Sequence, residues 1–134
     1  MNIRGVVETA LYADDLKAAA AFYCDVLGLE LLHGDAERDL FYRCGDAVLI
    51  VFDPQLTRLP TSKAPTHGAT GPGHVAFHVP QDELNMWIDR LLIHSVEIET
   101  EVTWPNGTRS VYFRDPAGNS LELTSPSLWF GTSE

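Results

Sequence analysis

The sequence predicts an α+β fold built from two tandem copies of one βαβββ module. Three observations predict this class. Strands that alternate in hydropathy are interrupted by single amphipathic helices, the order of elements occurs twice, and length differences between the copies fall in turns. Residue identity between the halves is low, so the order of elements carries the inference. A chain of 134 residues suits one domain, or two very small ones.

The first module is expected over about residues 5–53. Residues 6–13 alternate as a strand, and Asp14 or Asp15 can cap the helix that follows. Apolar residues recur at helical spacing over 15–28, where a glycine supplies the stop. Three further strands complete the module, at 29–34, 40–44 and 47–52.

A connector without structure of its own is expected over about 54–73, because this segment is rich in proline and glycine and poor in apolar residues. The second module then covers about 74–126, with its helix at 82–95 and a hairpin turn at Asn106-Gly107. Its strands are expected at 74–79, 96–104, 109–114 and 120–125. The tail, 127–134, carries Trp129 and Phe130, which we expect to dock on the body of the protein or on a partner chain.

Composition excludes several classes of function. With 9 Lys and Arg against 19 Asp and Glu, the net charge is −10 and the pI about 4.7, so phosphate backbones and anionic membranes would be repelled. No stretch is long and apolar enough to span a membrane or to resemble a signal peptide. The two cysteines, Cys24 and Cys44, imply no disulfide framework. A cytoplasmic domain without nucleic-acid or membrane partners is therefore expected.

Polar residues gather on one face of corresponding strands. Glu8 and Tyr12 share a face of the first strand, and His74 and His78 share a face of the strand that opens the second module. Glu122 occupies the same kind of position on the last strand. A sheet face in water shows this alternation too, so the pattern alone does not establish a site.

Three segments resemble the vicinal oxygen chelate superfamily, which is the group of glyoxalases, bleomycin resistance proteins and extradiol dioxygenases. They are ETALYADDLKAAAAFYCDVLGLELL, GPGHVAFHV and VYFRDPAGNSLEL, and the resemblance covers about residues 5–126. It implies two modules whose mixed sheets curl into a glyoxalase-like cup with the helices outside. It also implies a divalent metal held in the cup and, commonly, a homodimer.

By position, the resemblance assigns metal ligands to the first and last strands of each module, at Glu8, Ile50, His74 and Glu122. Isoleucine cannot bind a metal, so three ligands remain: Glu8, His74 and Glu122. Glyoxalase I uses four ligands, whereas extradiol dioxygenases and fosfomycin resistance enzymes use three, with a histidine where Glu8 stands. One imidazole and two carboxylates suit Fe²⁺, Mn²⁺, Ni²⁺, Co²⁺ or Zn²⁺ without selecting among them, and leave positions open for water and substrate.

The catalytic candidates are Glu122, Tyr12 and His78. Taken singly, each residue of the set has an ordinary explanation: Glu8 as a solvated strand end, His74 as a structural histidine beside a turn, and Glu122 as an alternating strand residue. His67, in the connector, is either a solvated loop residue or one that closes over the pocket.

The resulting hypothesis is a metal-dependent enzyme acting on a small molecule with vicinal oxygens. Ring-cleaving dioxygenase and glyoxalase-like lyase or isomerase both stay open. The alternative is a non-catalytic, bleomycin-resistance-type binding protein, which the acidic charge fits loosely. Fosfomycin-type thiol transfer ranks below both because it would require a histidine at position 8.

Overall fold

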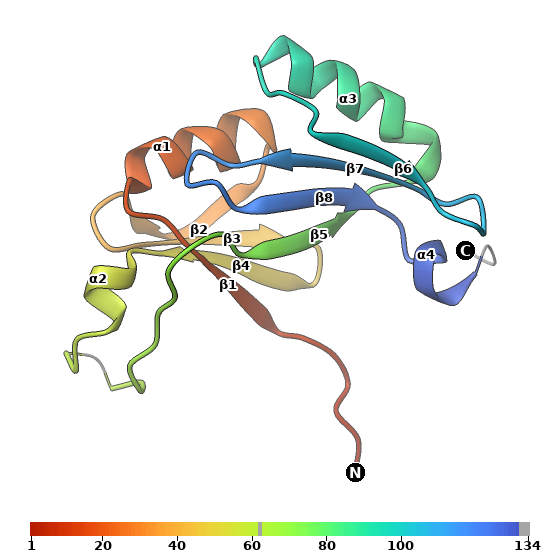
Figure 1. The fold of residues 1–134 in the computed structure, drawn as a ribbon. Coiled ribbons are helices and arrows are strands. Elements are labelled where there is room, and N and C mark those ends of the chain that lie inside the picture. Colours follow the sequence, from red (N-terminus) through yellow and green to blue (C-terminus); the bar gives the residue numbers. More distant parts are fainter. Residues whose placement is uncertain (62, 132–134) are drawn as a thin grey trace. The chain divides into compact units, whose positions relative to one another are not determined.

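The computed structural model describes residues 1–61 and 63–131. The chain divides into two compact units, Met1–Gly71 and Pro72–Glu134. Each unit contains one four-stranded mixed sheet with a helix between its first and second strands (Figure 1). The predicted α+β class, with two βαβββ modules, is confirmed.

In the first unit the strands are ordered β1-β4-β3-β2, with β1 parallel to β4 and the other neighbours antiparallel. The strands are β1 (Glu8–Tyr12), β2 (Glu30–Asp35), β3 (Asp39–Cys44) and β4 (Ala47–Phe52). The helical segments are α1 (Leu16–Ala21), the π-helical η1 (Phe22–Val26) and α2 (Pro54–Thr57).

The second unit repeats this topology as β5-β8-β7-β6, again with one parallel pair, β5 and β8. The strands are β5 (His74–His78), β6 (Thr100–Thr103), β7 (Arg109–Arg114) and β8 (Ser120–Thr124). The helical segments are the 3₁₀ turn η2 (Gln81–Glu83), α3 (Leu84–Ile93) and α4 (Ser127–Phe130). None of the helices within residues 1–61 and 63–131 is long and apolar enough to cross a membrane.

The parallel pairs of the two sheets have the same register, which makes positions in the two units equivalent. The pairs are Glu8 with Val48 and Ala10 with Ile50 in the first unit, and His74 with Ser120 and Ala76 with Glu122 in the second. Glu8 is thus the counterpart of His74, and Ile50 is the counterpart of Glu122. By the same count, Tyr12 corresponds to His78.

Each unit builds its core on one face of its sheet. In the first unit Leu49 and Val51 of the central strand β4 are buried with Leu16 of α1. In the second unit Leu121 and Leu123 of β8 are 0% and 2% exposed. Full burial of one such side chain contributes about 2 kcal/mol, so these faces fix the inward direction of each strand. Glu122, between the two leucines, therefore points to the opposite face.

The first helix differs from the uninterrupted α-helix predicted over 15–28. Asp15 caps its start, as expected, by accepting a hydrogen bond from the backbone nitrogen of Ala18. From Phe22 the turn widens, and the Leu27 nitrogen donates to the carbonyl of Phe22, five residues earlier. The adjacent rings of Phe22 and Tyr23 are both buried in this turn and meet edge to face.

The connector is not without structure, which corrects the prediction for 54–73. Asp53 caps the short helix α2 by accepting from the nitrogen of Gln55, and Pro54 occupies the first turn. Both residues are standard signals for a helix start, and the surrounding prolines and glycines obscured them. A second correction concerns the strand expected at 96–104, which starts only at Thr100.

That late start follows from how α3 ends. Ser95 adopts a left-handed conformation, with φ of 61°, and the nitrogen of Val96 turns back to the carbonyl of Leu91 at 2.8 Å. The residues after the helix therefore complete its C-terminus before the chain extends. At the other end of the unit, Trp129 and Phe130 are 79% and 83% exposed, so they are not docked on the body of this chain, and docking on a partner chain stays a prediction.

Gly34 tests the β2–β3 hairpin. Its φ is +101°, and a Cβ there would lie 2.2 Å from the carbonyl oxygen of Asp39. Gly34→Ala should lower the free energy of unfolding by about 2–3 kcal/mol, because it combines backbone strain with a backbone clash. Gly45→Ala, at a φ of +59° with open space around it, should cost only about 1 kcal/mol. Urea denaturation followed by circular dichroism measures both, and equal losses would contradict the clash.

Candidate functional site

Glu122 lies on the central strand of the second sheet and is 5% exposed. The Ser110 hydroxyl donates to its Oε2 at 2.5 Å, and Nε2 of His74 lies 3.4 Å from its Oε1. A buried carboxylate is costly unless hydrogen bonds and an opposite charge compensate it. Ser110 donates to Oε2, whereas Oε1 faces Nε2 of His74.

The orientation of His74 decides what its Nε2 can do. Nδ1 lies 2.9 Å from the carbonyl oxygen of Ser120, and a carbonyl only accepts, so Nδ1 carries a hydrogen. In the neutral ring Nε2 is then an acceptor that faces a carboxylate oxygen. Two facing acceptors require a proton or a cation between them. A histidine whose other nitrogen donates to a backbone carbonyl is also the usual arrangement of a metal ligand.

Three neighbours on the sheet support this pair. Trp104 Nε1 donates to Ser110 Oγ at 2.9 Å, which leaves the Ser110 hydrogen free to point at Glu122. The ring of Tyr112 stacks on His74, with centroids 6.4 Å apart and an interplanar angle of 24°. Burial raises the pKa of the Tyr112 phenol, and the charge of Glu122 and a hydrogen bond to it raise this pKa further, whereas a hydrogen bond to Ser110 lowers it. The Tyr112 phenol, which lies beside His74 and Glu122, therefore stays neutral.

Sequence reasoning missed Ser110, Tyr112 and Trp104 because it sought metal ligands only on the first and last strands of each module. A signal was present: Ser110 and Tyr112 alternate on β7 with buried apolar residues. The register then places Tyr112 directly opposite Glu122. An antiparallel neighbour of a strand that carries a ligand supplies side chains to the same face.

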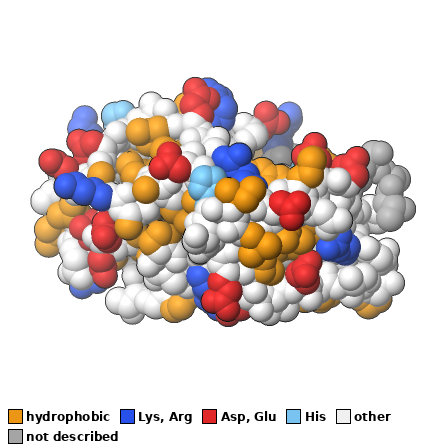
Figure 2. Space-filling model, turned by 90° about the horizontal axis from the view of Figure 1, so that it is seen from above, with side chains coloured by type: hydrophobic (Ala, Val, Ile, Leu, Met, Phe, Trp, Pro, Cys, Tyr) orange, Lys and Arg blue, Asp and Glu red, His pale blue; other side chains and the backbone are white. Residues whose placement is uncertain are grey.

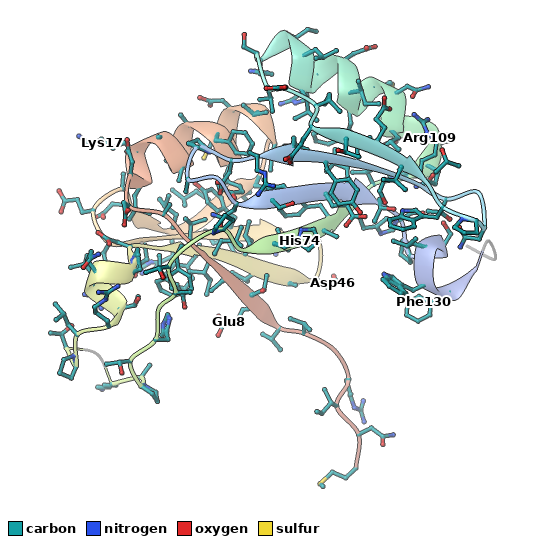
Figure 3. All side chains as sticks on the ribbon, in the orientation of Figure 1. Glu8, Lys17, Asp46, His74, Arg109 and Phe130 are labelled. Atoms are coloured by element: carbon teal, nitrogen blue, oxygen red, sulfur yellow. The ribbon has the colours of Figure 1, made fainter. Side chains whose placement is uncertain are left out.

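In the first unit, Glu8 is exposed at the start of β1, as Figure 3 shows, and its counterpart pair is incomplete because Ile50 is apolar and 4% exposed. Tyr12 lies four residues further along the strand, about 13 Å away. Its hydroxyl forms a 2.6 Å hydrogen bond with Nδ1 of His67, so the structure brings Tyr12 together with the connector histidine.

His78 is exposed at the end of β5, on the same face as His74 but four residues away, again about 13 Å along the strand. This distance is too long for the two histidines to share an ion. Among residues 1–61 and 63–131, no three His, Cys, Asp or Glu side chains are gathered closely enough to hold a metal ion. The structure therefore brings together two of the three predicted ligands, His74 and Glu122.

Three arginines on strands form ion pairs with glutamates at the surface. Each donates to a glutamate of a neighbouring strand segment, and on the face seen in Figure 2 acidic and basic side chains are interspersed with apolar ones. The pairs are Arg43 with Glu30 at 3.0 Å, Arg109 with Glu101 at 3.2 Å and Arg114 with Glu99 at 2.9 Å.

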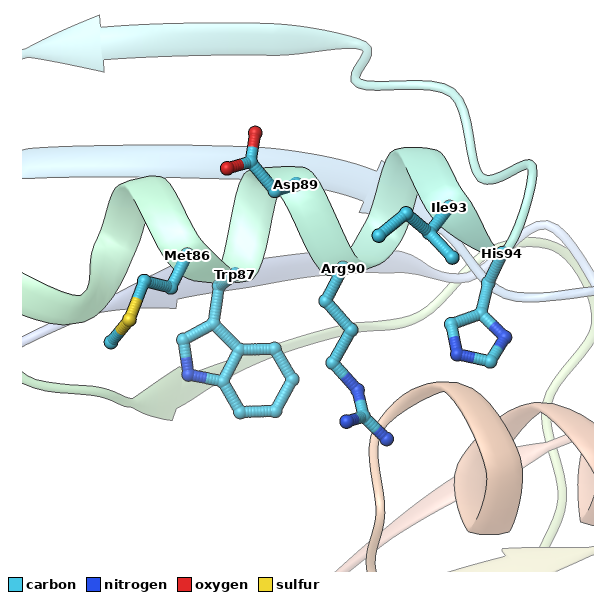
Figure 4. Close-up of a pocket in the computed structure, with 6 residues that line it drawn as sticks. All are labelled: Met86, Trp87, Asp89, Arg90, Ile93 and His94. Atoms are coloured by element: carbon cyan, nitrogen blue, oxygen red, sulfur yellow. The ribbon is translucent and has the colours of Figure 1, made fainter.

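A hollow of about 600 Å³ lies along α3 and its C-cap residue His94 (Figure 4). Its lining side chains all come from this one helix, and Arg90 lies over the ring of Trp87 at 5.8 Å. Asp89 and His94 are separated along the helix and do not converge on a point. Because the hollow lacks converging polar groups, we place the candidate site at His74 and Glu122.

A comparison with protein families covers most of the chain. The sequence profile of the Glyoxalase/Bleomycin resistance protein/Dioxygenase superfamily matches residues 5–123. The chain belongs to this superfamily. One relative is the uncharacterized protein YaeR of Escherichia coli (strain K12). It is 32% identical over 130 residues, which cover 92% of this chain and 97% of YaeR.

Several solved structures share the fold of this chain. A lactoylglutathione lyase from Agrobacterium tumefaciens is 44% identical, with a TM-score of 0.91 over 96% of this chain and 98% of that chain. The fosfomycin resistance protein FosX from Mesorhizobium loti has a TM-score of 0.67 at 18% identity, over 95% of this chain and 96% of its own. The second likeness shows the fold alone. Together they confirm the glyoxalase-like α+β fold expected from the sequence.

Glu122→Gln tests whether the carboxylate at position 122 lowers the stability of the metal-free protein. The amide nitrogen of glutamine can donate to Nε2 of His74 while its oxygen accepts from Ser110, so every polar atom is satisfied. Thermal unfolding in EDTA should show the variant at least as stable as the wild type, with a gain of about 1 kcal/mol.

Glu97→Gln is the matched control, because it removes one negative charge from an exposed position. It should leave the melting temperature in EDTA unchanged. A clear loss of stability in Glu122→Gln but not in the control would contradict the facing-acceptor description and favour a structural ion pair.

Proposed function

We propose that the protein is a metal-dependent, glyoxalase-type enzyme that acts on a small molecule with vicinal oxygens. The metal ligands in this proposal are His74 and Glu122, completed by Glu8 of the first unit. The single observation that carries it is the pair itself: Nε2 of His74 faces Oε1 of Glu122 at 3.4 Å while Nδ1 is held by the Ser120 carbonyl. One imidazole and two carboxylates suit a divalent ion of the Fe²⁺, Mn²⁺, Ni²⁺, Co²⁺ or Zn²⁺ group.

The similarity to the lactoylglutathione lyase favours lyase or isomerase chemistry over ring cleavage, because 44% identity extends over nearly the whole chain. The FosX from Listeria monocytogenes whose structure holds Mn(II) is only 19% identical and supports the fold without choosing the reaction. We therefore propose a hemithioacetal or a related 2-hydroxycarbonyl compound as the substrate class. A cytoplasmic homodimer is the form in which we expect the enzyme to work.

When bound, a divalent ion would act as a Lewis acid that polarises the oxygens of the substrate. The chain supplies the remaining functions. Glu122 is the residue proposed to move the substrate proton, since its carboxylate is buried and oriented by Ser110. Tyr112 stacks on the His74 ring, and its phenol stays neutral because its pKa is raised. Tyr12 and His78, equivalent by register, remain proposed substrate-facing residues at the far end of each first strand.

Metal binding tests the ligand set. Isothermal titration of metal-free protein with Ni²⁺, Zn²⁺ or Mn²⁺ should give one site per chain. His74→Ala, Glu122→Gln and Glu8→Gln should each weaken it by more than about 100-fold because each removes a ligand. His78→Ala is the matched control and should bind like the wild type, since His78 lies about 13 Å along the strand from His74.

Full metal occupancy in His74→Ala or Glu122→Gln would contradict this ligand assignment. Loss of binding in those two variants but not in Glu8→Gln would retain the His–Glu pair and reject Glu8 as the third ligand. A wild-type protein that binds no divalent metal, yet binds a cationic aromatic drug stoichiometrically, would favour the sequestering function.

Ser110→Ala tests support of Glu122 without removing a ligand. Because the hydroxyl orients the carboxylate, its loss should lower kcat/KM for the hemithioacetal of methylglyoxal and glutathione by about 10- to 100-fold, together with metal affinity. Thr103→Ala, on the neighbouring strand β6 and without contact to Glu122 in the described hydrogen bonds, is the control. Oxygen uptake with catechols and no isomerisation would show that the lyase assignment is wrong.

A further inference from the structure

The first unit contains a cavity that the metal site does not use. Its volume is about 220 Å³, and it lies between the face of the first sheet and the connector after β4. All of its lining residues belong to Met1–Gly71. The described lining therefore comes from one unit.

Hydrogen bonds hold the connector over the sheet. The backbone nitrogen of His67 donates to the carbonyl of Thr57, at the end of α2, at 3.0 Å. Its side-chain Nδ1 bonds the hydroxyl of Tyr12 on β1 at 2.6 Å. His67 thus links the connector to both the helix and the sheet. These two hydrogen bonds fix the part of the connector that covers the cavity.

The walls of the cavity are aromatic. Phe52 meets His67 edge to face, with centroids 4.8 Å apart and an interplanar angle of 71°. Phe41 meets Phe52 in the same way at 6.0 Å and 81°. Leu59 and Pro65 of the connector add apolar surface. Rings at right angles present both edges and faces to an occupant, which are the preferred partners of another flat ring.

Polar groups lie at one part of this wall. Arg38 and Asp39 line the cavity, with Nε of Arg38 3.8 Å from Oδ2 of Asp39, and their side chains are 43% and 20% exposed. Their partial exposure places a donor and an acceptor between the apolar lining and solvent. An occupant with one hydrogen-bonding substituent on an apolar ring would satisfy both parts.

We propose that this cavity is a binding subsite for a six-membered aromatic ring that carries a hydroxyl or similar polar substituent. An apolar cavity of about 150 Å³ holds benzene, so about 220 Å³ accommodates such a ring with a short substituent. The subsite goes beyond the proposed metal chemistry and does not depend on it, because no residue of the His74–Glu122 pair takes part. It gives the chain a preference for aromatic over aliphatic ligands.

Phenol is the probe that tests the subsite, added to the full ¹⁵N- and ¹³C-labelled chain in EDTA. Chemical-shift changes should be confined to the surroundings of Phe41, Phe52 and His67, with a dissociation constant on the order of 1 mM for so small a ligand. Cyclohexanol, of similar size but without a flat ring, should bind at least about fivefold more weakly.

Two variants separate loss of the subsite from loss of the fold. Phe52→Leu removes a ring from the wall and should weaken phenol binding at least about tenfold. Ala64→Phe, at an exposed connector position that lines the cavity, should block binding by filling the space. Phe130→Leu, an exposed phenylalanine of the second unit, is the matched control and should bind like the wild type.

The proposal is overturned if phenol shifts residues outside the first unit instead, if cyclohexanol binds as well as phenol, or if Ala64→Phe retains binding while its spectrum shows a native fold. Since every titration is done without metal, failure here leaves the proposed metal site untouched. Failure of metal binding likewise leaves the subsite standing.

Discussion

The contact between His74 and Glu122 is the constraint on which the proposed chemistry depends. The Ser120 carbonyl takes the hydrogen of Nδ1, so the other ring nitrogen presents a lone pair to a carboxylate that is 5% exposed. In the neutral form of the ring neither group satisfies the other, and a proton or a cation between them would. Burial of the Glu122 carboxylate costs free energy unless it is compensated, whereas the His74 side chain is 51% exposed. We propose that a bound cation supplies this compensation.

The rest of the second unit positions that contact. Leu121 and Leu123 fix the inward face of β8 and thereby turn Glu122 to the other face. The Trp104 indole directs the Ser110 hydroxyl, which in turn orients the carboxylate. In the first unit, the register positions equivalent to His74 and Glu122 are occupied by Glu8 and Ile50. The repeated topology therefore gives two equivalent frameworks, of which one carries the exposed imidazole of His74 beside the buried carboxylate of Glu122.

The repeated βαβββ order was predictable because hydropathy alternation, Asp15 and the Asn106-Gly107 turn are local signals. The carboxylate and imidazole of the site were predictable only through family resemblance, since each has an ordinary explanation alone. Ser110 and Tyr112 were not, because their role depends on strand register, which is a long-range property. The π-helical turn at Phe22 and the late start of β6 were missed for other reasons: packing of the Phe22 and Tyr23 rings and the left-handed conformation of Ser95 overrode local propensity.

The most direct test of the central claim is anomalous diffraction from crystals of the full chain soaked in Mn²⁺. We predict a peak between His74 and Glu122, within about 2.0–2.3 Å of Nε2 of the histidine and Oε1 of the glutamate, the range of ordinary metal–ligand bonds. A native structure whose only Mn²⁺ peaks lie elsewhere, with Nε2 and Oε1 still facing each other, would contradict the account.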